Sequence, residues 1–452
     1  MRRDFVPTRY CLAVALSVAL CSCSNTSTPG GLGLEDKVNS KIAAEIKNTR
    51  VIDNHAHPAR NVGPGEARDR DFDALPADAM EDAALPAPAR PDNPAYTIAW
   101  RELFDYGYKD ASEAHLKSLR EAKQRIAAAQ GDRYPTWVLN KTGTDIMLAN
   151  RVAMGKSLPN DRFKWVPFAD MFLFPLNNES FYRLDSEHRG FIGSEERLLK
   201  KQLSEAGMAT APAIFDEYLT FISHTLEQWK SSGAVAVKFE FAYLRDLQID
   251  NPSREAAERV FAIYARSSEP TSEEYKTVQD FLFRYIALEA GRLELPVHIH
   301  CASGIGSYFR TPNGNPLALE SLFDDPKLRK TKFVLLHGGW PFTKQAASMT
   351  LKPNVYVDTS GLQYFAYPTE VAQAMRNYLE TAPEKVLFGT DASPLGGDIG
   401  WEETAWTGTR FGRLALGLAL TGMVQDGEIT EVRAKELAKM VLRENARGLY
   451  RF

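Results

Sequence analysis

Two histidines separated by a single residue, His55 and His57, close the short apolar stretch of the segment VIDNHAHP. Side chains alternate along a β-strand, so residues two apart lie on the same face of it. Two neutral imidazoles on one face at a strand end can bind a single metal ion, and zinc is a common ion for such ligands. One pair of this kind is weak support for a metal site unless other strand ends supply further ligands.

Further residues of this kind follow other apolar runs of the chain. Five of the eight histidines lie at the carboxyl ends of such runs, and chance placement explains that poorly. A lone histidine beside an apolar run is more often a buried core residue, but five of them with a lysine and an aspartate indicate a metal site. The residues concerned are His55, His57, Lys238, His298, His300, His337 and Asp391.

These apolar runs alternate with amphipathic stretches, a pattern typical of an α/β fold with parallel strands. Helices are expected where apolar residues recur at intervals of three and four. Eight strand–helix units predict a (β/α)8 TIM barrel, in which the carboxyl ends of all strands meet on one face. The expected strands are 50–54, 145–148, 164–168, 234–238, 297–300, 333–337, 355–358 and 386–391, and the expected helices include 112–130, 214–231, 272–292 and 428–449.

The segment 58–140, between the first and second expected strands, is unusually long. Its first part, 58–94, holds seven prolines and reads as an irregular excursion, and a helical piece from about 96 to 130 follows. The loop after a barrel strand lies on the active-site face, so the segment is predicted to be an insertion that caps the site or closes over a substrate. A solvent-exposed loop or a contact in a homodimer would fit the sequence equally well.

Residues 1–22 have the form of a targeting segment, with three arginines before an apolar core that is short for a membrane span. The end of this segment resembles a bacterial lipoprotein signal with Cys23 as the lipidated residue, and an ordinary cleaved secretory signal is the alternative. Small polar residues over 23–35 predict a flexible tether to a domain that covers 36–452. The protein is thus expected in the bacterial cell envelope, at the outer membrane or the periplasmic face, held by its lipid alone.

The remaining composition excludes several classes of function. The net charge of −4 and the lack of a basic block argue against nucleic-acid binding. Once the targeting segment is set aside, Cys23 and Cys301 are the only cysteines, so no disulfide within the chain is expected. The chain has no GxSxG nucleophile motif, no Walker loop and no dinucleotide fingerprint. A small-molecule substrate is the expected partner.

The chain resembles the amidohydrolase superfamily, and more closely its amidohydrolase-related branch. The resemblance covers nearly the whole chain after the tether. Its motifs also occur in the family's order and spacing, which makes the resemblance specific. Within the branch, the chain is similar to FluG-like and nodulin-like domains. Three features carry this similarity: the opening DNHAHP, Lys238 followed by Tyr243-Leu244-Arg245, and the ending Asn445-Ala446-Arg447. The segments that carry the wider resemblance are VIDNHAHP, VHIHCASG, FVLLHGGWPF, VLFGTDASP and ENARGLY.

The resemblance implies a role for each candidate ligand. His55, His57 and Asp391 would bind a divalent metal ion, with zinc the expected ion, and His300 would be the next ligand. His337 would complete a second metal site or contact the substrate and the attacking water, and Asp391 would also accept the proton of that water. A divalent ion lowers the pKa of water from about 16 toward 7 and polarises a carbonyl. A neighbouring carboxylate can then move the proton to the leaving group, and a protonated His337 would stabilise the oxyanion.

Neighbouring residues are expected to support these ligands. The hydroxyls of Thr390 and Ser393 stand on either side of Asp391 in the sequence and could fix its orientation. His298 lies on the same strand face as His300 but deeper, so a supporting or packing role is expected for it rather than ligation.

Lys238 decides the number of metal ions. In binuclear relatives the lysine of the fourth strand is carboxylated and bridges two ions, because an ammonium has no lone pair to offer a metal. The alternative is a protonated Lys238 that binds an anionic group of the substrate, or that pairs with Glu240 on the same face. One ion is the preferred expectation, and a second ion stays open.

Two further residues are candidates for substrate contact. Arg245 follows the fourth strand and could bind a carboxylate through two parallel hydrogen bonds, which would suit γ-glutamyl or dipeptide-like substrates. A surface salt bridge is the alternative for Arg245. Trp340 follows the sixth strand and could form a wall of the pocket or pack against the next helix. The substrate is therefore expected to be small and to carry a carboxylate.

The sequence thus predicts a metal-dependent hydrolase of a C–N bond, amide or peptide-like. A zinc-dependent decarboxylase of the same branch is the first alternative, because those enzymes use the same histidines and aspartate. They need no lysine on the fourth strand, so Lys238 favours hydrolysis. A catalytically inactive, surface-anchored binding barrel is the second alternative, and the complete ligand set argues against it.

Overall fold

The computed structural model describes residues 33–60, 69–75, 85–155, 157–266, 268–306 and 309–452. The expected targeting segment and most of the expected tether, Cys23 included, lie outside the described residues. Glu35, the last tether residue, begins the 3-10 turn η1 (Glu35–Lys37), and its Oε1 lies 3.1 Å from Arg410 Nη2. Among the described helices, none is both long and apolar enough to cross a membrane.

The described residues form two parallel β-sheets at the centre of the molecule. One sheet has the order β1-β2-β3 and the other has the order β4-β5-β6-β7-β8. Every strand begins within three residues of its predicted start, although β8 is shorter than predicted. The strands are β1 (Val51–Ala56), β2 (Thr144–Asn150), β3 (Phe163–Val166), β4 (Val237–Phe239), β5 (Val297–His300), β6 (Phe333–Leu336), β7 (Val355–Asp358) and β8 (Val386–Leu387).

Isolated bridges and a few backbone hydrogen bonds join the edges of the two sheets. A parallel bridge pairs Phe168, just after β3, with Lys238 of β4. On the opposite edge, Asp391 N–H donates to His55 O at 2.7 Å, beyond the end of β8. Regular pairing is interrupted at both places, so the ladder is not continuous around the strands.

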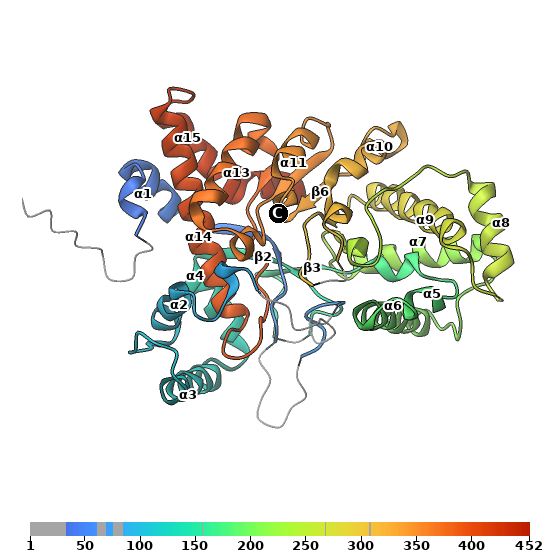
Figure 1. Cartoon of the computed structure of the whole chain (residues 1–452), viewed down its shortest axis with the longest axis horizontal. Coiled ribbons are helices and arrows are strands. Elements are labelled where there is room, and N and C mark those ends of the chain that lie inside the picture. Colours follow the sequence, from blue (N-terminus) through green and yellow to red (C-terminus); the bar gives the residue numbers. More distant parts are fainter. Residues whose placement is uncertain (1–32, 61–68, 76–84, 156, 267, 307–308) are drawn as a thin grey trace, which may run out of the picture.

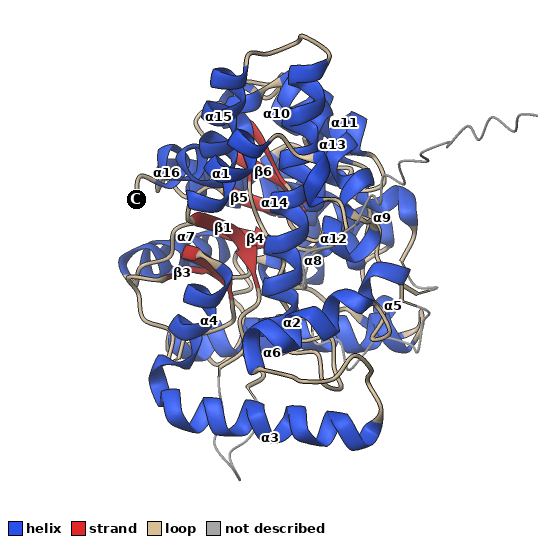
Figure 2. Cartoon of the chain, turned by 90° about the vertical axis from the view of Figure 1, so that its left-hand side faces the viewer, coloured by secondary structure: helices blue, strands red, loops and turns tan. Residues whose placement is uncertain are grey.

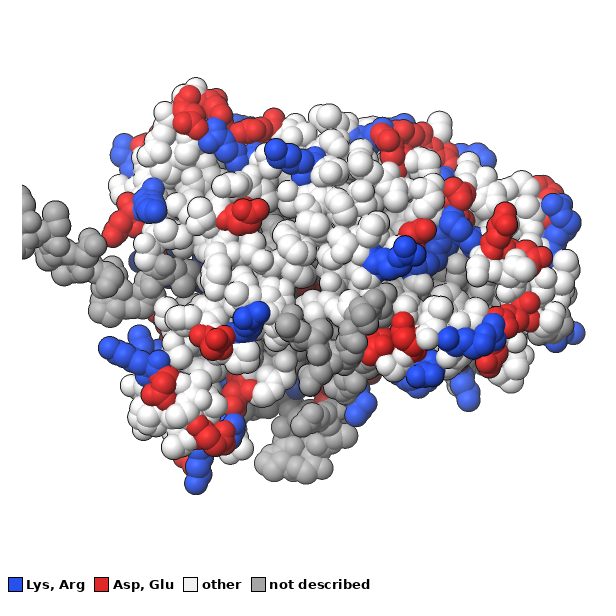
Figure 3. Space-filling model, viewed as in Figure 1, with Lys and Arg blue, Asp and Glu red and all other residues white. Residues whose placement is uncertain are grey.

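Helices surround the strands (Figures 1 and 2). On the face in Figure 3, acidic and basic side chains are interspersed, in keeping with the small net charge. The helices are α1 (Ser40–Asn48), α2 (Pro94–Phe104), α3 (Glu113–Gln130), α4 (Tyr134–Thr142), α5 (Glu179–Tyr182), α6 (Ser186–Glu205), α7 (Phe215–Ser231), α8 (Arg254–Tyr264), α9 (Ser272–Arg292), α10 (Glu320–Phe323), α11 (Thr343–Met349), α12 (Leu362–Phe365), α13 (Pro368–Thr381), α14 (Trp401–Gln425), α15 (Glu431–Lys439) and α16 (Asn445–Tyr450).

Three of the predicted helices match α3, α7 and α9 to within a residue at each end. The N-terminus of α9 is closed by a capping box, in which Thr271 and Glu274 each accept a hydrogen bond from the other's backbone N–H. The helix predicted over 428–449 is divided into α15, a π-helical turn (Met440–Glu444) and α16. The helical piece predicted from about 96 to 130 is also divided, because Asp105 ends α2 in the left-handed conformation.

The described part of the segment 58–140 lies in two places. Helices α2 and α3 pack against α14 through an apolar cluster that contains Trp100, Leu103, Leu119 and Trp406. In Figure 2, α3 lies across one end of the molecule. Residues 69–75 and 85–89 instead approach the carboxyl ends of the strands, where Asp73, Leu75, Leu85 and Ala89 line a cavity. Only this second part bears directly on the site.

The interior between the strands is filled by small and branched apolar side chains. Ile52, Leu148 and Val334 belong to this layer, and Ala446 of α16 closes it from below. The C-terminal residues therefore pack against the amino-terminal end of the strands, away from the cavity. A filled interior leaves the opposite, carboxyl end as the place where strand-end residues can meet a ligand.

Candidate metal centre

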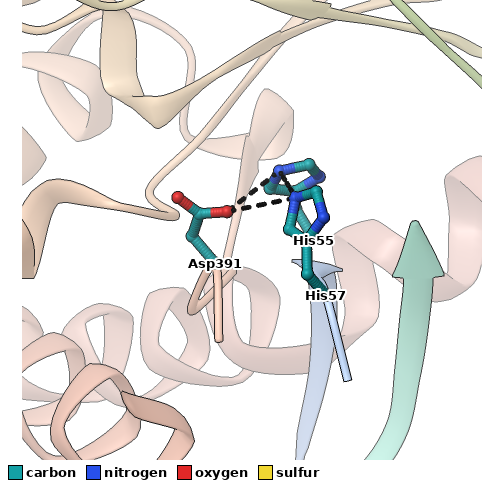
Figure 4. A group of neighbouring side chains, drawn as sticks. All are labelled: His55, His57 and Asp391. Carbon is teal, nitrogen blue, oxygen red and sulfur yellow. Dashed lines mark hydrogen bonds and ion pairs between the residues drawn. The ribbon is translucent and has the colours of Figure 1, made fainter. Parts of the chain in front are cut away.

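His55, His57 and Asp391 converge at the carboxyl ends of β1 and β8 (Figure 4). His55 Nε2 lies 3.2 Å from Asp391 Oδ1, and His57 Nε2 lies 3.5 Å from the same oxygen. The two Nε2 atoms are 3.3 Å apart. Among the described residues, these three form a group whose potential ligand atoms all lie within 4.8 Å of one another.

These separations fit a shared metal ion. Ligands about 2.1 Å from a tetrahedral ion lie about 3.4 Å from each other, which is the spacing found between the three ligand atoms. Both histidines are almost fully buried, and neutral imidazoles with a carboxylate are a ligand set typical of zinc. The residues present therefore suit a divalent cation.

His300 and His337 complete the ring of imidazoles around this point. The ring centre of His337 lies 5.0 Å from that of His55 and 4.6 Å from that of His300. His337 Nδ1 lies 3.6 Å from Asp391 Oδ2, the carboxylate oxygen that does not face the β1 histidines. The predicted ligands from four strand ends are thus brought together.

The backbone is strained at two of these positions. His337 (φ 61°) and Asp391 (φ 55°) both adopt the left-handed conformation, which is unfavourable for residues other than glycine. Gly361 (φ 72°) packs against both, and a Cβ there would lie 2.8 Å from His337 Nδ1 and 3.1 Å from Asp391 Oδ2. Strain that the surroundings maintain at two neighbouring polar residues is typical of a functional site.

Asp53 holds the metal-facing strand ends together, a role that the sequence reading missed. This fully buried carboxylate accepts hydrogen bonds from His55 N–H at 3.3 Å and Thr390 N–H at 2.9 Å. Its other oxygen accepts the Thr390 hydroxyl at 2.5 Å. The Thr390 hydroxyl therefore serves Asp53, and the expectation that it orients the carboxylate of Asp391 directly was wrong.

Asp358 holds the backbone of His337 in the way that Asp53 holds that of His55. Its Oδ1 accepts hydrogen bonds from His337 N–H at 3.1 Å and from the Ser360 hydroxyl at 2.6 Å, and its Oδ2 accepts one from Asn54 Nδ2 at 2.9 Å. Because that hydroxyl donates to Asp358, Ser360 Oγ accepts from His337 Nδ1–H at 3.2 Å. The signal in the sequence was a carboxylate at the end of the seventh strand, but two of its partners are distant in sequence: Asn54 lies in β1 and His337 directly follows β6.

Carbonyl groups fix the tautomers of two more histidines. His57 Nδ1 lies 3.1 Å from Phe72 O, so this nitrogen carries the proton and leaves the Nε2 lone pair for a metal. His300 Nε2 lies 3.2 Å from Ala302 O, which leaves Nδ1 unprotonated. Partners of this kind orient metal-binding imidazoles in proteins.

Burial favours neutral imidazoles at this site, beside a carboxyl that would be ionised only with a cation nearby. Burial and the charge of Lys238 lower the pKa of His57 to about 3 and hold the pKa of His55 and His300 well below the usual range. Burial raises the pKa of Asp391 well above that of an ordinary carboxyl. A bound divalent cation would supply the missing positive charge and keep Asp391 ionised.

His337 is held neutral by the same causes. Burial and the neighbouring His300 and Lys238 place its pKa well below the usual range. The expectation of an imidazolium that stabilises an oxyanion therefore has no support, whereas a neutral His337 with its proton on Nδ1 keeps the Nε2 lone pair for a metal or a proton.

Lys238 is buried at the same cavity, where a carboxylate faces it. Its Nζ lies 3.5 Å from Glu240 Oε2, as one of the sequence alternatives expected. Glu240 Oε1 has no hydrogen-bond partner among the described residues. The same holds for two nearby carboxyls, at Asp170 Oδ2 and at both oxygens of Glu195. Burial raises the pKa of Glu240 to about 8 and that of Asp170 and Glu195 well above the usual range.

Three sequence candidates lie outside this constellation. Arg245 is not among the residues that line the cavity, and its Nη2 lies 2.8 Å from Asp280 Oδ1. Trp340 stacks on Phe365 with ring centres 4.4 Å apart, so it supports the cavity wall from behind. His298 lies deeper, as expected, and its Nε2 lies 2.7 Å from the Tyr450 hydroxyl.

The cavity above the metal-binding residues has a volume of about 200 Å³. His57, His300, His337 and Asp391 form its floor, and further charged groups come from Asp73, Lys238 and Glu240. Apolar and hydroxyl-bearing side chains complete the lining, namely Leu75, Leu85, Ala89, Phe191, Tyr243, Ala302, Ser303, Ile305, Tyr364, Phe365, Ser393, Pro394 and Leu395.

Comparison with known proteins decides the family. A model of the amidohydrolase family matches residues 225–452, which is half of the chain and includes β4 to β8. The chain belongs to the amidohydrolase family. It is also 28% identical over 231 residues to the protein fluG of Emericella nidulans. The match takes in 48% of this chain and 25% of that protein, so this amidohydrolase spans about a quarter of its relative.

Solved structures share the fold of this amidohydrolase. A uronate isomerase from Thermotoga maritima superposes with a TM-score of 0.61 at 14% identity, covering 93% of this chain and 99% of that one. A presumed metal-dependent hydrolase from Lactobacillus casei gives a TM-score of 0.57 at 16% identity, covering 91% and 97%. At such identities the likeness concerns the fold alone.

Proposed function

We propose that this protein is a metal-dependent hydrolase that cleaves a C–N bond of an amide or peptide-like substrate. The observation that carries the proposal is the convergence of His55 Nε2, His57 Nε2 and Asp391 Oδ1 within 3.2–3.5 Å, with His57 and Asp391 at the floor of a cavity. Membership of the amidohydrolase family supports it.

The fold that we propose is a closed (β/α)8 barrel with the segment 58–140 as an insertion after β1. Support comes from the bridges at both edges of the two sheets, where Phe168 pairs with Lys238 and Ala56 with Ala392. Closing the ladder places every strand's carboxyl end around the same cavity, which accounts for the meeting of residues from β1, β5, β6 and β8.

A bound divalent ion, zinc in our proposal, would polarise the substrate carbonyl and lower the pKa of water beside it. The two oxygens of Asp391 have different surroundings: Oδ1 faces His55 and His57, and Oδ2 faces His337 at 3.6 Å. Asp391 Oδ2 is therefore free to accept a proton from water and to release it to the leaving nitrogen, with His337 as its neighbour.

The surroundings of Lys238 favour a single ion. A carboxylated lysine would carry a negative charge, and it would face Glu240 where the ammonium now lies 3.5 Å from Oε2. Burial and neighbouring carboxyls raise the pKa of the nearby Asp170 and Glu195 well above the usual range, so this neighbourhood already disfavours negative charge. Like charges in a buried site repel strongly, so we propose that Lys238 is an ammonium and that the site holds one ion.

Product analysis distinguishes hydrolysis from the decarboxylase alternative, since the same ligands would serve both reactions. The zinc-loaded protein should be incubated with amides, dipeptides and aromatic carboxylic acids. Release of amine supports the proposal, and release of carbon dioxide without amine overturns it in favour of the lyase. A protein that binds zinc tightly but turns over none of these classes would favour the inactive binding barrel.

We also propose attachment to the bacterial cell envelope through a lipid on Cys23, on the grounds of the sequence alone. A Cys23→Ala variant should move from the membrane fraction to the soluble fraction of expressing cells. Unchanged fractionation would refute the lipid anchor.

A further inference from the structure

We propose that Asp73 and Glu240 form a subsite that binds a primary ammonium group of the substrate beside the metal centre. This inference rests on the proposed function, because it concerns the substrate of the same cavity. It names a class of substrate, small amides with a free amine, that the metal-binding residues alone do not define.

The charge of the cavity is the first argument. Its charged lining consists of Asp73, Lys238 and Glu240 together with the metal-facing Asp391, and no arginine lines it among the described residues. With Asp391 assigned to the ion, Asp73 and Glu240 share one lysine, and burial raises the pKa of Glu240 to about 8 because no further cation of the described chain lies beside it. A bound ammonium group would supply that cation, whereas an anionic substrate group would find only a lysine that is already paired.

The second argument is an unsatisfied oxygen. Glu240 has a side chain only 6% exposed, and its Oε1 has no hydrogen-bond partner among the described residues. Its backbone N–H is held by Asp170 Oδ1 at 2.7 Å, so the residue is fixed in place. A buried carboxylate oxygen without a donor is unfavourable, and a ligand with N–H groups would remove that penalty.

A separate set of contacts holds the segment that carries Asp73. This segment is anchored by Asp69, whose carboxylate pairs with the buried Arg151 at 2.9 and 3.1 Å. Three residues after Asp69, the carbonyl of Phe72 accepts the Nδ1 proton of His57. Asp73 Oδ1 consequently lies 3.7 Å from His57 Nδ1, at the rim of the metal centre. The subsite therefore has a fixed position relative to the metal ligands.

The remaining lining limits the substrate in size and polarity. Leu75, Leu85, Phe365 and Leu395 give the cavity an apolar wall, and a volume of about 200 Å³ holds only a small ligand. A short aliphatic group between an ammonium and an amide would match these features, as in the amide of an aliphatic amino acid.

Binding of a matched pair of probes tests the subsite without any turnover. The zinc-loaded protein should be titrated calorimetrically at pH 7.5 with 3-methylbutylammonium and with the neutral 3-methylbutan-1-ol. The cation should bind at least tenfold more tightly in the wild type, and Glu240→Gln and Asp73→Asn should each reduce that preference to about twofold or less. Asp71→Asn removes a carboxylate that does not line the cavity, so it should keep the full preference.

Equal affinity for the two probes in the wild type, or no measurable binding of either, would overturn the subsite. So would a preference that survives in both Glu240→Gln and Asp73→Asn, provided that their melting temperatures match the wild type.

Turnover separates this proposal from the proposed function. L-leucinamide should be hydrolysed with a kcat/KM at least tenfold above that of N-acetyl-L-leucinamide, and the two variants should lose this ratio mainly through KM. Equal hydrolysis of both amides would overturn the ammonium subsite and leave the hydrolase standing. Hydrolysis of neither, with the probe preference intact, would leave the subsite standing and count against C–N hydrolysis.

Discussion

Two groups of buried carboxyls flank the candidate metal centre, and they differ in how their oxygens are satisfied. The paired carboxyls, Asp53 and Asp358, accept hydrogen bonds on every oxygen from the ends of neighbouring strands. The unpaired carboxyls, Asp170, Glu195 and Glu240, each have at least one oxygen without a partner among the described residues.

The difference assigns separate tasks to the two regions. Hydrogen bonds to the charged form favour ionisation, and the pKa of Asp53 and Asp358 is raised by burial only to about 7 and about 6. The pKa of Asp170 and Glu195 is raised well above the usual range by burial and by neighbouring carboxyls. The paired carboxyls position the ligands, and the unpaired ones mark a place where a proton or a bound cation is needed.

Turning a paired carboxyl into an unpaired one should have the largest effect on stability. Asp69, a third paired carboxyl, has a side chain only 3% exposed and depends on Arg151. Arg151→Met should lower the free energy of unfolding by about 3 kcal/mol, because it removes the buried partner of Asp69 and leaves only the more exposed Arg60, whose Nε lies 3.6 Å from Asp69 Oδ1. Chemical denaturation would measure this. Arg376→Met, which breaks exposed ion pairs, should change it by about 1 kcal/mol or less, and equal losses would contradict the assignment.

Removing the acceptor at Asp53 should weaken the metal centre next. Asp53→Ala leaves His55 N–H and the Thr390 donors without a partner, so the strand ends that carry the ligands lose their alignment. We expect zinc affinity to fall about 10–100-fold, as for other groups that orient metal ligands. Competition with a chelator would measure it, and an affinity within twofold of the wild type would show that Asp53 has no positioning role.

The pH dependence of zinc binding should follow the carboxylate rather than the histidines. Burial raises the pKa of Asp391 and lowers that of His57 to about 3, so acid protonates Asp391 first. As pH falls through the raised pKa of Asp391, zinc affinity should fall about tenfold per pH unit, the loss expected for one proton. Titrations between pH 5 and 8 would check this. A slope of two or more protons would implicate the histidines instead.

The smallest expected effect is a gain in stability on the unpaired side. The pKa of Glu195 is raised in the folded state, so its stabilising contribution is present at acid pH and is lost as pH rises above the pKa of the unfolded chain. Glu195→Gln removes this loss. The difference in free energy of unfolding between the variant and the wild type should therefore be about 1 kcal/mol more favourable to the variant at pH 8 than at pH 6. Denaturation at the two pH values would measure it, and a variant less stable at pH 8 would show that the carboxylate is satisfied there.

The sequence predicted what depends on local pattern. Apolar runs fixed the strand positions, and the polar residues at their ends, His55, His300 and Asp391 among them, do meet at one site. The family of the chain was also readable from these motifs, and the comparison confirmed it. The closed barrel and the lipid on Cys23 stay predictions.

The rest could not be read because it depends on contacts between distant segments. The partners of Asp358 come from β1 and from the end of β6, which no spacing in the sequence reveals. Asp73 lies in a proline-rich stretch without periodicity, so nothing in the pattern pointed to the cavity. Arg245 had the right chemistry for a carboxylate, but Asp280 already pairs with it.

The zinc content of the purified protein tests the metal centre most directly. Protein stripped of metal and dialysed against zinc should hold one ion per chain, measured by plasma mass spectrometry, whereas His57→Ala and Asp391→Ala should hold none at the same free zinc concentration. Stoichiometry of one in both variants, or none in the wild type, would contradict the site formed by His55, His57 and Asp391.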